Sequence, residues 1–312
     1  MRRQTMSKIF FGCLAAAVVF SGCATSNTTA LPKAMKYEAP QRRLLTTEGK
    51  KANKAEEAPD TADDCEHLGD LNLQKGDVTT ALVNYSRALQ LEPNRLSVSY
   101  KMGRLFLLKG MTAKARGEFE KIIKKDPKNA LAHEAMGRTY LLDNNSEKAI
   151  EYFTKALDLN ERLWEAYNLL GIAYDRQRKF DRAIYHYRAA ILLKPDAGAV
   201  YNNLGVSYYL NGEYDKAKDA FITALEKGEE RSKVYNNLAF TFAQLGNYRA
   251  ARATLKKVGD EATAQNNLGY LYLRNGKNKE ASVAFEKAIE LSATFYREAY
   301  ENLNMANDAL QK

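Results

Sequence analysis

The sequence predicts an all-α fold, a right-handed superhelical solenoid of seven helix pairs with a further helix at its C-terminal end. The first observation is a skeleton of small and bulky residues that recurs at a 34-residue step from residue 62 onward. The second is that each step holds two segments with apolar residues at the three- and four-residue spacing of a helix. Because one such pair cannot bury its apolar face alone, a series of pairs indicates a stacked array.

The unit from Gly198 to Arg231 shows the pattern. Its first segment places Leu204 and Gly205 on the packing face, and its second places Ala217 and Phe221 there. The small residue of the first helix recurs at Gly69, Gly103, Gly137, Gly171, Gly205, Ala239 and Gly269. The alanine of the second helix recurs at Ala81, Ala115, Ala149, Ala183, Ala217, Ala251 and Ala281. The bulky residue four positions later is Tyr85, Phe119, Phe153, Tyr187, Phe221, Leu255 or Phe285.

These residues resemble the tetratricopeptide repeat (TPR) family, which has the same period and the same small and aromatic positions. The resemblance covers seven units, namely 62–95, 96–129, 130–163, 164–197, 198–231, 232–261 and 262–295. The sixth unit is four residues short around Val258, so we expect a shortened second helix or turn there. Residues 296–312 predict one more helix, a cap with a polar outer face.

The first 22 residues predict a secretory signal, because basic residues precede an apolar run from Ile9 to Phe20. This run is too short to span a bilayer as a helix. Phe20 to Cys23 is similar to a bacterial lipoprotein processing box, which implies that Cys23 carries the lipid. The resemblance and Ala24 together imply an outer-membrane lipoprotein that faces the periplasm. The alternative is an ordinary cleaved leader with an incidental cysteine.

Residues 23–61 predict a lipidated cysteine followed by a disordered tether, because Ser, Thr, Pro, Lys and Glu dominate and no period appears. The formal charge of the whole chain is +9. No unit has a lysine and arginine stripe interleaved with exposed aromatic residues, so we expect no nucleic-acid partner.

The residues that could carry chemistry are scattered. His67, His133 and His186 lie in three different units without the spacing of metal ligands. No phosphate loop, zinc pair or nucleophile motif is found. We therefore expect no enzyme activity, no cofactor, no metal site and no small-molecule substrate. Cys65 and His133 fall on packing positions, which predicts that both are at least partly buried.

The candidate binding residues are asparagines and aromatics on the first helices of units four to seven. The resemblance implies that the second, fifth, ninth and twelfth positions of each unit face a concave groove. Asparagine holds the fifth position in four successive units, and a second asparagine follows it in three: Asn168, Asn202, Asn203, Asn236, Asn237, Asn266 and Asn267. Tyr209, Phe240 and Tyr270 add aromatic rings, with Arg176 and Arg274 at the edge.

An asparagine amide both donates and accepts hydrogen bonds, so it can pair with the backbone of a peptide whatever side chains that peptide carries. The groove is therefore predicted to bind an extended segment of a protein partner. The alternative is that the asparagines hydrogen-bond between neighbouring helices. Units one to three lack them and have Glu66, Tyr100 and Glu134 at the fifth position.

Two functions remain open. The layout is similar to outer-membrane TPR lipoproteins that serve pilus or secretin assembly, including the tight-adherence type, which implies a scaffold that holds a protein partner while an envelope machine is built. The other function is contact with peptidoglycan or an exported polysaccharide, in which the groove aromatics would stack on sugars.

Overall fold

Every regular element in residues 61–229 and 231–311, the ranges that the computed structural model describes, is an α-helix. The helices are α2 (Ala62–Gln74), α3 (Val78–Leu91), α4 (Leu96–Leu108), α5 (Thr112–Lys125), α6 (Ala130–Leu142), α7 (Ser146–Leu159), α8 (Trp164–Arg176), α9 (Phe180–Leu193), α10 (Gly198–Leu210), α11 (Tyr214–Glu226), α12 (Arg231–Gln244), α13 (Tyr248–Leu255), α14 (Glu261–Arg274), α15 (Asn278–Leu291) and α16 (Arg297–Leu310). The predicted all-α fold is confirmed. The predicted leader, Cys23 and the tether up to residue 60 lie outside the described residues.

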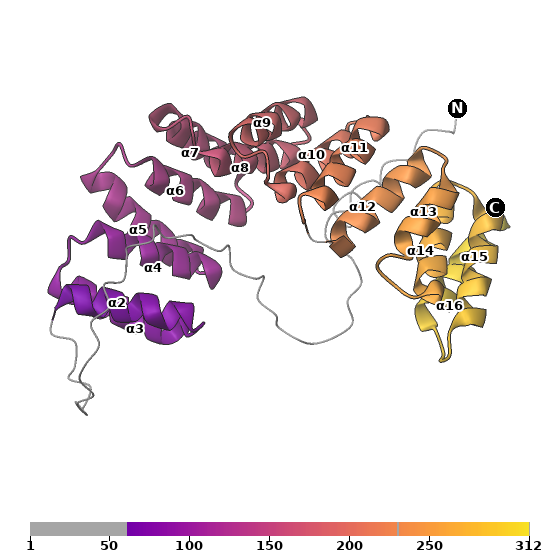
Figure 1. Ribbon diagram of the computed structural model, residues 1–312, viewed down its shortest axis with the longest axis horizontal. Coiled ribbons are helices and arrows are strands. Elements are labelled where there is room, and N and C mark those ends of the chain that lie inside the picture. The colour runs from indigo at the N-terminus through magenta and orange to yellow at the C-terminus, as the bar shows by residue number, and fades with distance from the viewer. Residues whose placement is uncertain (1–60, 230, 312) are drawn as a thin grey trace, which may run out of the picture. The chain divides into compact units, whose positions relative to one another are not determined.

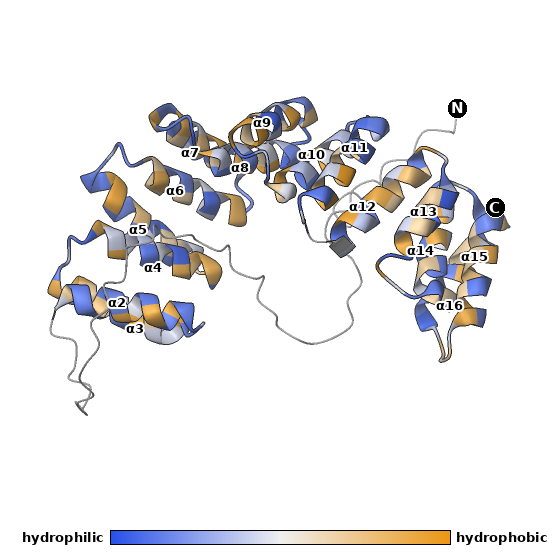
Figure 2. Cartoon of the chain, viewed as in Figure 1, coloured by the Kyte–Doolittle hydropathy of each residue, from blue (hydrophilic) through white to orange (hydrophobic). Residues whose placement is uncertain are grey.

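The helices pack in chain order, each against the next (Figure 1). The first five predicted units begin at the first residues of α2, α4, α6, α8 and α10, and α12 and α14 each begin one residue before the predicted start. Figure 2 shows that the helices carry both hydrophobic and hydrophilic residues, as expected when one face packs and the other meets water. No helix in the described ranges is long and apolar enough to cross a membrane.

Six of the seven units are closed by a glycine that lies against an aromatic ring. A Cβ atom placed on Gly205 would lie 2.7 Å from Cδ1 of Phe221, a ring that is 1% exposed. The same contact joins the glycine and the aromatic residue in five other units: Gly69 with Tyr85, Gly103 with Phe119, Gly137 with Phe153, Gly171 with Tyr187 and Gly269 with Phe285. The two residues are always 16 apart, so they fix how the first helix of a unit meets the second.

The turns inside the units contain residues in the left-handed region. Gly212 has φ of 82°, which ends α10 without a steric penalty. In unit four the equivalent residue is Arg178, with φ of 59°. A side chain in this conformation costs free energy, so the packing of α8 and α9 must outweigh it.

The sixth unit departs from the others, as its length predicts. Helix α13 has 8 residues, whereas the other helices have 13 or 14. The short turn that follows is held by Glu261 at the start of α14, which pairs with Arg252 and lies 2.7 Å from Nζ of Lys256. These two cations lower the pKa of Glu261 to about 2. In this unit Ala239 and Leu255 replace the glycine and the aromatic residue, and both are buried.

Both polar and apolar side chains are exposed on α16 and on the residues just before it. Asn307 and Asp308 of α16 are exposed as expected. However, Phe295 is 76% exposed and stacks on Tyr300 with ring centroids 5.0 Å apart, and Met305 is also exposed. The end of the array therefore combines exposed polar groups with exposed aromatic rings.

Candidate functional site

The predicted groove asparagines form hydrogen bonds between units. Nδ2 of Asn203 donates to Oδ1 of Asn168 in the preceding unit at 3.0 Å. Nδ2 of Asn237 donates to Oδ1 of Asn202 at the same distance. We call such a bond a rung: the sixth position of one unit donates to the fifth position of the unit before it. Asn202 is only 1% exposed, so its oxygen is committed to the rung.

A third rung was missed at the sequence level. Nδ2 of Asn302, in α16, donates to Oδ1 of Asn266 at 3.0 Å, and Asn266 is 2% exposed. The signal was present, because Tyr300, Asn302 and Leu303 match three of the four residues of the order Tyr-Asn-Asn-Leu in units five and six, with Glu301 at the other position. Helix α16 therefore takes the place that the first helix of a further unit would have. Its Asn302 supplies the donor for Asn266, the last acceptor of the series.

One rung of the series is open. Oδ1 of Asn236 is buried and has no hydrogen-bond partner. Its expected donor, Asn267, is partly buried and has no side-chain hydrogen bond with any residue of the described ranges. The shortened sixth unit explains this, because Asn267 follows Asn236 by 31 residues, whereas the donors of the closed rungs follow by 35 or 36.

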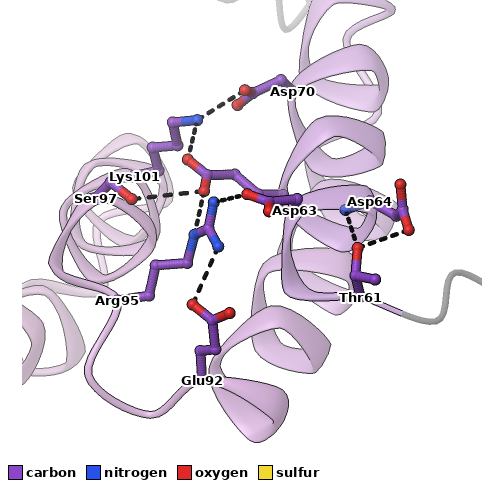
Figure 3. Close-up of polar contacts among 9 residues, drawn as sticks. Thr61, Asp63, Asp64, Asp70, Glu92, Arg95, Ser97 and Lys101 are labelled. Carbon is purple, nitrogen blue, oxygen red and sulfur yellow. Dashed lines mark hydrogen bonds and ion pairs between the residues drawn. The ribbon is translucent and has the colours of Figure 1, made fainter.

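The first two units use charged groups in the same register (Figure 3). Nζ of Lys101 lies 2.6 Å from a carboxylate oxygen of Glu66, 35 residues before it, and 2.7 Å from Asp70. Nε of Arg95 donates to the second oxygen of Glu66 at 2.6 Å, and Arg95 also pairs with Asp63. Units one and two are thus tied by an ionic rung, whereas amide rungs join units four to six and join unit seven to α16.

Two polar side chains of α8, Asp175 and the predicted groove residue Arg176, also tie units together. Asp175 accepts hydrogen bonds from Oη of Tyr187, at 2.8 Å, and from the hydroxyl of Ser207 in the next unit. Burial raises the pKa of Asp175 to about 6, although both hydroxyls oppose the shift. Arg176 donates to the carbonyl oxygen of Leu141 and, at 3.2 Å, to Oδ1 of Asn144 in the preceding unit. The guanidinium of Arg176 is therefore hydrogen-bonded to the preceding unit of the array.

The remaining predicted residues come together on α10, α12 and α14. The rings of Phe240 and Tyr270 meet edge to face, with centroids 6.3 Å apart. The guanidinium carbon of Arg274 lies 5.8 Å from the Phe240 centroid, within the range of a cation–π contact. Burial raises the pKa of Tyr209, and the positive charge of nearby Arg274 opposes that shift. We call Tyr209, Phe240, Tyr270 and Arg274 the aromatic–arginine cluster.

The three helices that carry this cluster have more basic than acidic residues. Helix α10 has no charged residue, α12 has Arg231 and Lys233, and α14 has Glu261 and Arg274. Glu261 is paired with Arg252 of α13 and with Lys256, which follows α13. Arg274 has no ion pair within the described ranges, although its charge is held over the Phe240 ring. An anionic ligand would therefore meet no unpaired carboxylate on these three helices.

The histidines and Cys65 are placed largely as predicted. Nε2 of His133 lies 2.9 Å from the carbonyl oxygen of Pro127, while Nδ1 is buried without a partner. His186 stacks on Tyr174 with centroids 5.2 Å apart, and burial lowers its pKa to about 4. Cys65 is buried. In the described part of the chain no three His, Cys, Asp or Glu residues are grouped to hold a metal ion.

Comparison with protein families agrees with the repeat pattern. The model of the tetratricopeptide repeat protein 21 C-terminal ARM domain matches residues 42–226. The chain belongs to the tetratricopeptide repeat family. Two further tetratricopeptide repeat models match residues 196–258 and 262–295 of this TPR protein. Such repeats are generally non-catalytic scaffolds for protein–protein interaction. A comparison with curated proteins found no match.

Three solved structures show the same fold. PilW, described as a widely conserved type IV pilus biogenesis factor, is 17% identical with a TM-score of 0.60, over 64% of this chain and 93% of that one. A tetratricopeptide repeat protein from Parabacteroides merdae is 18% identical with a TM-score of 0.56, over 79% and 98%. The Cut9–Hcn1 structure is 18% identical with a TM-score of 0.58, over 78% and 49%.

Proposed function

We propose that this TPR protein is a lipid-anchored periplasmic scaffold that holds a protein partner during assembly of an envelope machine such as a pilus or secretion system. The observation that carries the proposal is the aromatic–arginine cluster on α10, α12 and α14. Aromatic residues and arginine are the side chains most enriched where proteins bind one another. In the cluster the rings of Phe240 and Tyr270 and the guanidinium of Arg274 are in contact on adjacent first helices.

The choice of machine rests on likeness. PilW, which shares the fold, is described as a pilus biogenesis factor. Fold alone is weak support for function, so the partner must be found by experiment. The anchor rests on residues 20–24, where small residues precede Cys23. A diacylated cysteine would supply the two chains that stable membrane attachment needs.

The anchor is tested by replacing Cys23 with Ser and fractionating cells of a bacterium that has two membranes. The variant should move from the membrane to the soluble periplasmic fraction. Cys13→Ser is the matched control, because Cys13 lies inside the apolar run of the leader, and it should leave the protein in the membrane. A Cys23→Ser protein that still fractionates with membranes would contradict the anchor.

The partner is tested by placing a photo-crosslinking amino acid at position 270 of the full-length protein in living cells. We expect a protein adduct that includes a component of a pilus or secretion machine. The same probe at Val83, which is exposed on the second helix α3, is the control and should not give that adduct. An adduct with peptidoglycan or polysaccharide, or no adduct at position 270, would refute the protein-scaffold function.

A further inference from the structure

The turns that join the two helices of units two, three and four carry a surplus of positive charge. Eight basic and three acidic residues lie in the segments that contain these turns, 108–116, 142–148 and 176–182. The connections at the other end of the second helices hold four basic and four acidic residues, in segments 125–131, 159–165 and 193–199. We call the first three segments the basic edge. The positive charge of these units is therefore concentrated at one end of their helices.

Each turn of the basic edge presents a cation beside an aromatic ring. The third residue of the second helix is basic and exposed in all three units: Lys114, Lys148 and Arg182. Nζ of Lys148 lies 5.2 Å from the ring centroid of Tyr140, and the guanidinium carbon of Arg182 lies 5.7 Å from that of Tyr174. Lys114 and Phe106 make the same contact at 5.8 Å. The rings limit where the cations can lie, so less conformational freedom is lost when an anion binds.

The free charge of the basic edge is positive. Each of its acidic residues has a partner: Asp143 pairs with Arg116, Glu147 accepts a hydrogen bond from Gln177, and Asp181 accepts one from Asn211. Within the described ranges Lys114, Lys148 and Arg182 form cation–π contacts and no ion pair. The same position in unit five is Lys216, which is paired with Glu213. The series of unpaired cations therefore ends at unit four.

Unit four adds a charge at a position where glycine would be more stable. Arg178 has φ of 59°, whereas units two and five have Gly110 and Gly212 at the equivalent place. A side chain in this conformation costs free energy, so the charge is kept despite that cost. Its guanidinium carbon lies 5.7 Å from the ring centroid of Phe180. A planar guanidinium can bind a phosphate through two parallel hydrogen bonds.

Exposed apolar side chains lie among these cations. Leu108 and Leu142 are the last residues of α4 and α6, and they are 65% and 54% exposed. Met111, in the turn that precedes Lys114, is exposed as well. A single exposed leucine is ordinary on a protein surface. Here the same position in two successive units places a leucine beside a lysine that has no ion pair, which is the combination found on surfaces that lie at a membrane interface.

We propose that the basic edge binds the surface of an anionic phospholipid membrane. The cations lie at the headgroup phosphates, and Leu108 and Leu142 enter the boundary between headgroups and acyl chains. A soluble acidic polymer would neutralise the cations but leave the leucines in water, whereas a lipid surface accepts both kinds of side chain. The inference goes beyond the proposed function, because the folded units make this contact and a lipid on Cys23 does not.

The test is flotation with vesicles of the purified full-length Cys23→Ser protein, which cannot be lipidated at residue 23. It should bind vesicles of phosphatidylethanolamine with about 30% phosphatidylglycerol more tightly than vesicles of phosphatidylcholine, because the attraction needs a negative surface potential. Raising NaCl from about 0.05 to about 0.5 M should release it, because salt screens the charges. The leader is the same in every variant below, so differences between variants report the basic edge.

Two pairs of further substitutions separate charge from apolar contact. Each basic residue near an anionic surface contributes about fivefold, so Lys148→Gln with Arg182→Gln should lower the partition coefficient about 25-fold. The matched control is Lys125→Gln with Lys155→Gln, which removes two exposed charges from the second helices α5 and α7 outside the basic edge and should leave binding unchanged.

The apolar contact has its own control. Leu142→Ser should weaken binding to the anionic vesicles while leaving its dependence on NaCl unchanged. Leu192→Ser should bind like the parent protein, because Leu192 is 82% exposed on α9 but lies outside the basic edge. The melting temperatures of all variants should stay close to that of the parent, since every substituted side chain is exposed.

Equal binding to the two kinds of vesicle, or normal binding after Lys148→Gln with Arg182→Gln, would overturn the inference. An equal loss in the Lys125 and Lys155 control would do so too, and so would binding to a soluble acidic polysaccharide but not to vesicles. None of these outcomes affects the scaffold function, which the crosslink at position 270 tests in cells.

Discussion

A methyl group added at Gly205 tests the packing that closes each unit. In Gly205→Ala the new Cβ would lie 2.7 Å from Cδ1 and from Cε1 of Phe221, and 3.0 Å from Cζ. Carbon atoms in contact are normally about 3.5–4.0 Å apart, so the ring must retreat by about 1 Å. Phe221 is almost fully buried in a cluster of apolar side chains, so its ring can retreat only if neighbouring side chains also shift.

Two opposing effects set the size of the change in the free energy of unfolding. Overpacking a core typically costs about 1–3 kcal/mol. Replacing a helical glycine by alanine returns about 0.5–1 kcal/mol of backbone entropy. We therefore expect Gly205→Ala to lower the free energy of unfolding by about 1–2 kcal/mol, and the loss to reach the adjoining units, since stability in arrays depends on neighbour interfaces.

Urea denaturation followed by circular dichroism measures this change, and the chain supplies two controls. Gly117 lies inside α5 with nothing within 4 Å of its added Cβ, so Gly117→Ala should stabilise the protein. In the background Phe221→Leu, which imitates the Ala239 and Leu255 pair of unit six, Gly205→Ala should cost nothing. The two changes should thus be non-additive by at least about 1 kcal/mol. A Gly205→Ala protein as stable as the wild type would refute the argument.

Three further predictions concern the rungs, pH and the short unit. Asn237→Ala leaves a buried oxygen without its donor and should cost about 1–3 kcal/mol of unfolding free energy, whereas Asn267→Ala should cost close to nothing; equal losses in denaturation would contradict the open rung. Burial raises the pKa of Asp175 from 3.8 to about 6, so the carboxylate is disfavoured in the folded state and the protein loses stability as pH rises through that window. Asp175→Asn should therefore raise the free energy of unfolding by up to about 3 kcal/mol at pH 7.5 and by much less at pH 4. A stabilisation that does not depend on pH would exclude this cause. Backbone amides of residues 256–265 should exchange hydrogen faster than those at the turn near Pro195, and equal protection by mass spectrometry would show that the shortened unit is not a weak joint.

The positions of the units could be predicted because their determinants are local. The 16-residue spacing of Gly205 and Phe221 lies within one hairpin, and the recurrence of that spacing fixes the register of the helices. The shortened α13 could be predicted as well, because the four residues that this unit lacks are missing around Val258, near the end of its second helix. These features depend on residues that are close in the chain.

The rungs depend on pairs of units, and for that reason they were harder to predict. The asparagines were identified, but their partners follow from a rule that the structure reveals, a donor at the sixth position 35 residues after an acceptor at the fifth. Lys101 and Glu66 follow the same spacing but form an ion pair. A search for asparagines alone cannot find this pair. The failure of one rung depends on how a shortened α13 displaces α14, and periodicity contains no information on that displacement.

The rungs also determine how the length of the array can change. Unit five supplies a donor, Asn203, to the unit before it and an acceptor, Asn202, to the unit after it. A tandem duplication of residues 198–231 would give the first copy's acceptor the second copy's donor, and every amide at the new junction would be paired. A duplication of unit six would repeat its 30-residue step and add another acceptor without a donor. Growth of this protein by gene duplication is therefore expected to be tolerated at its fifth unit and disfavoured at its sixth.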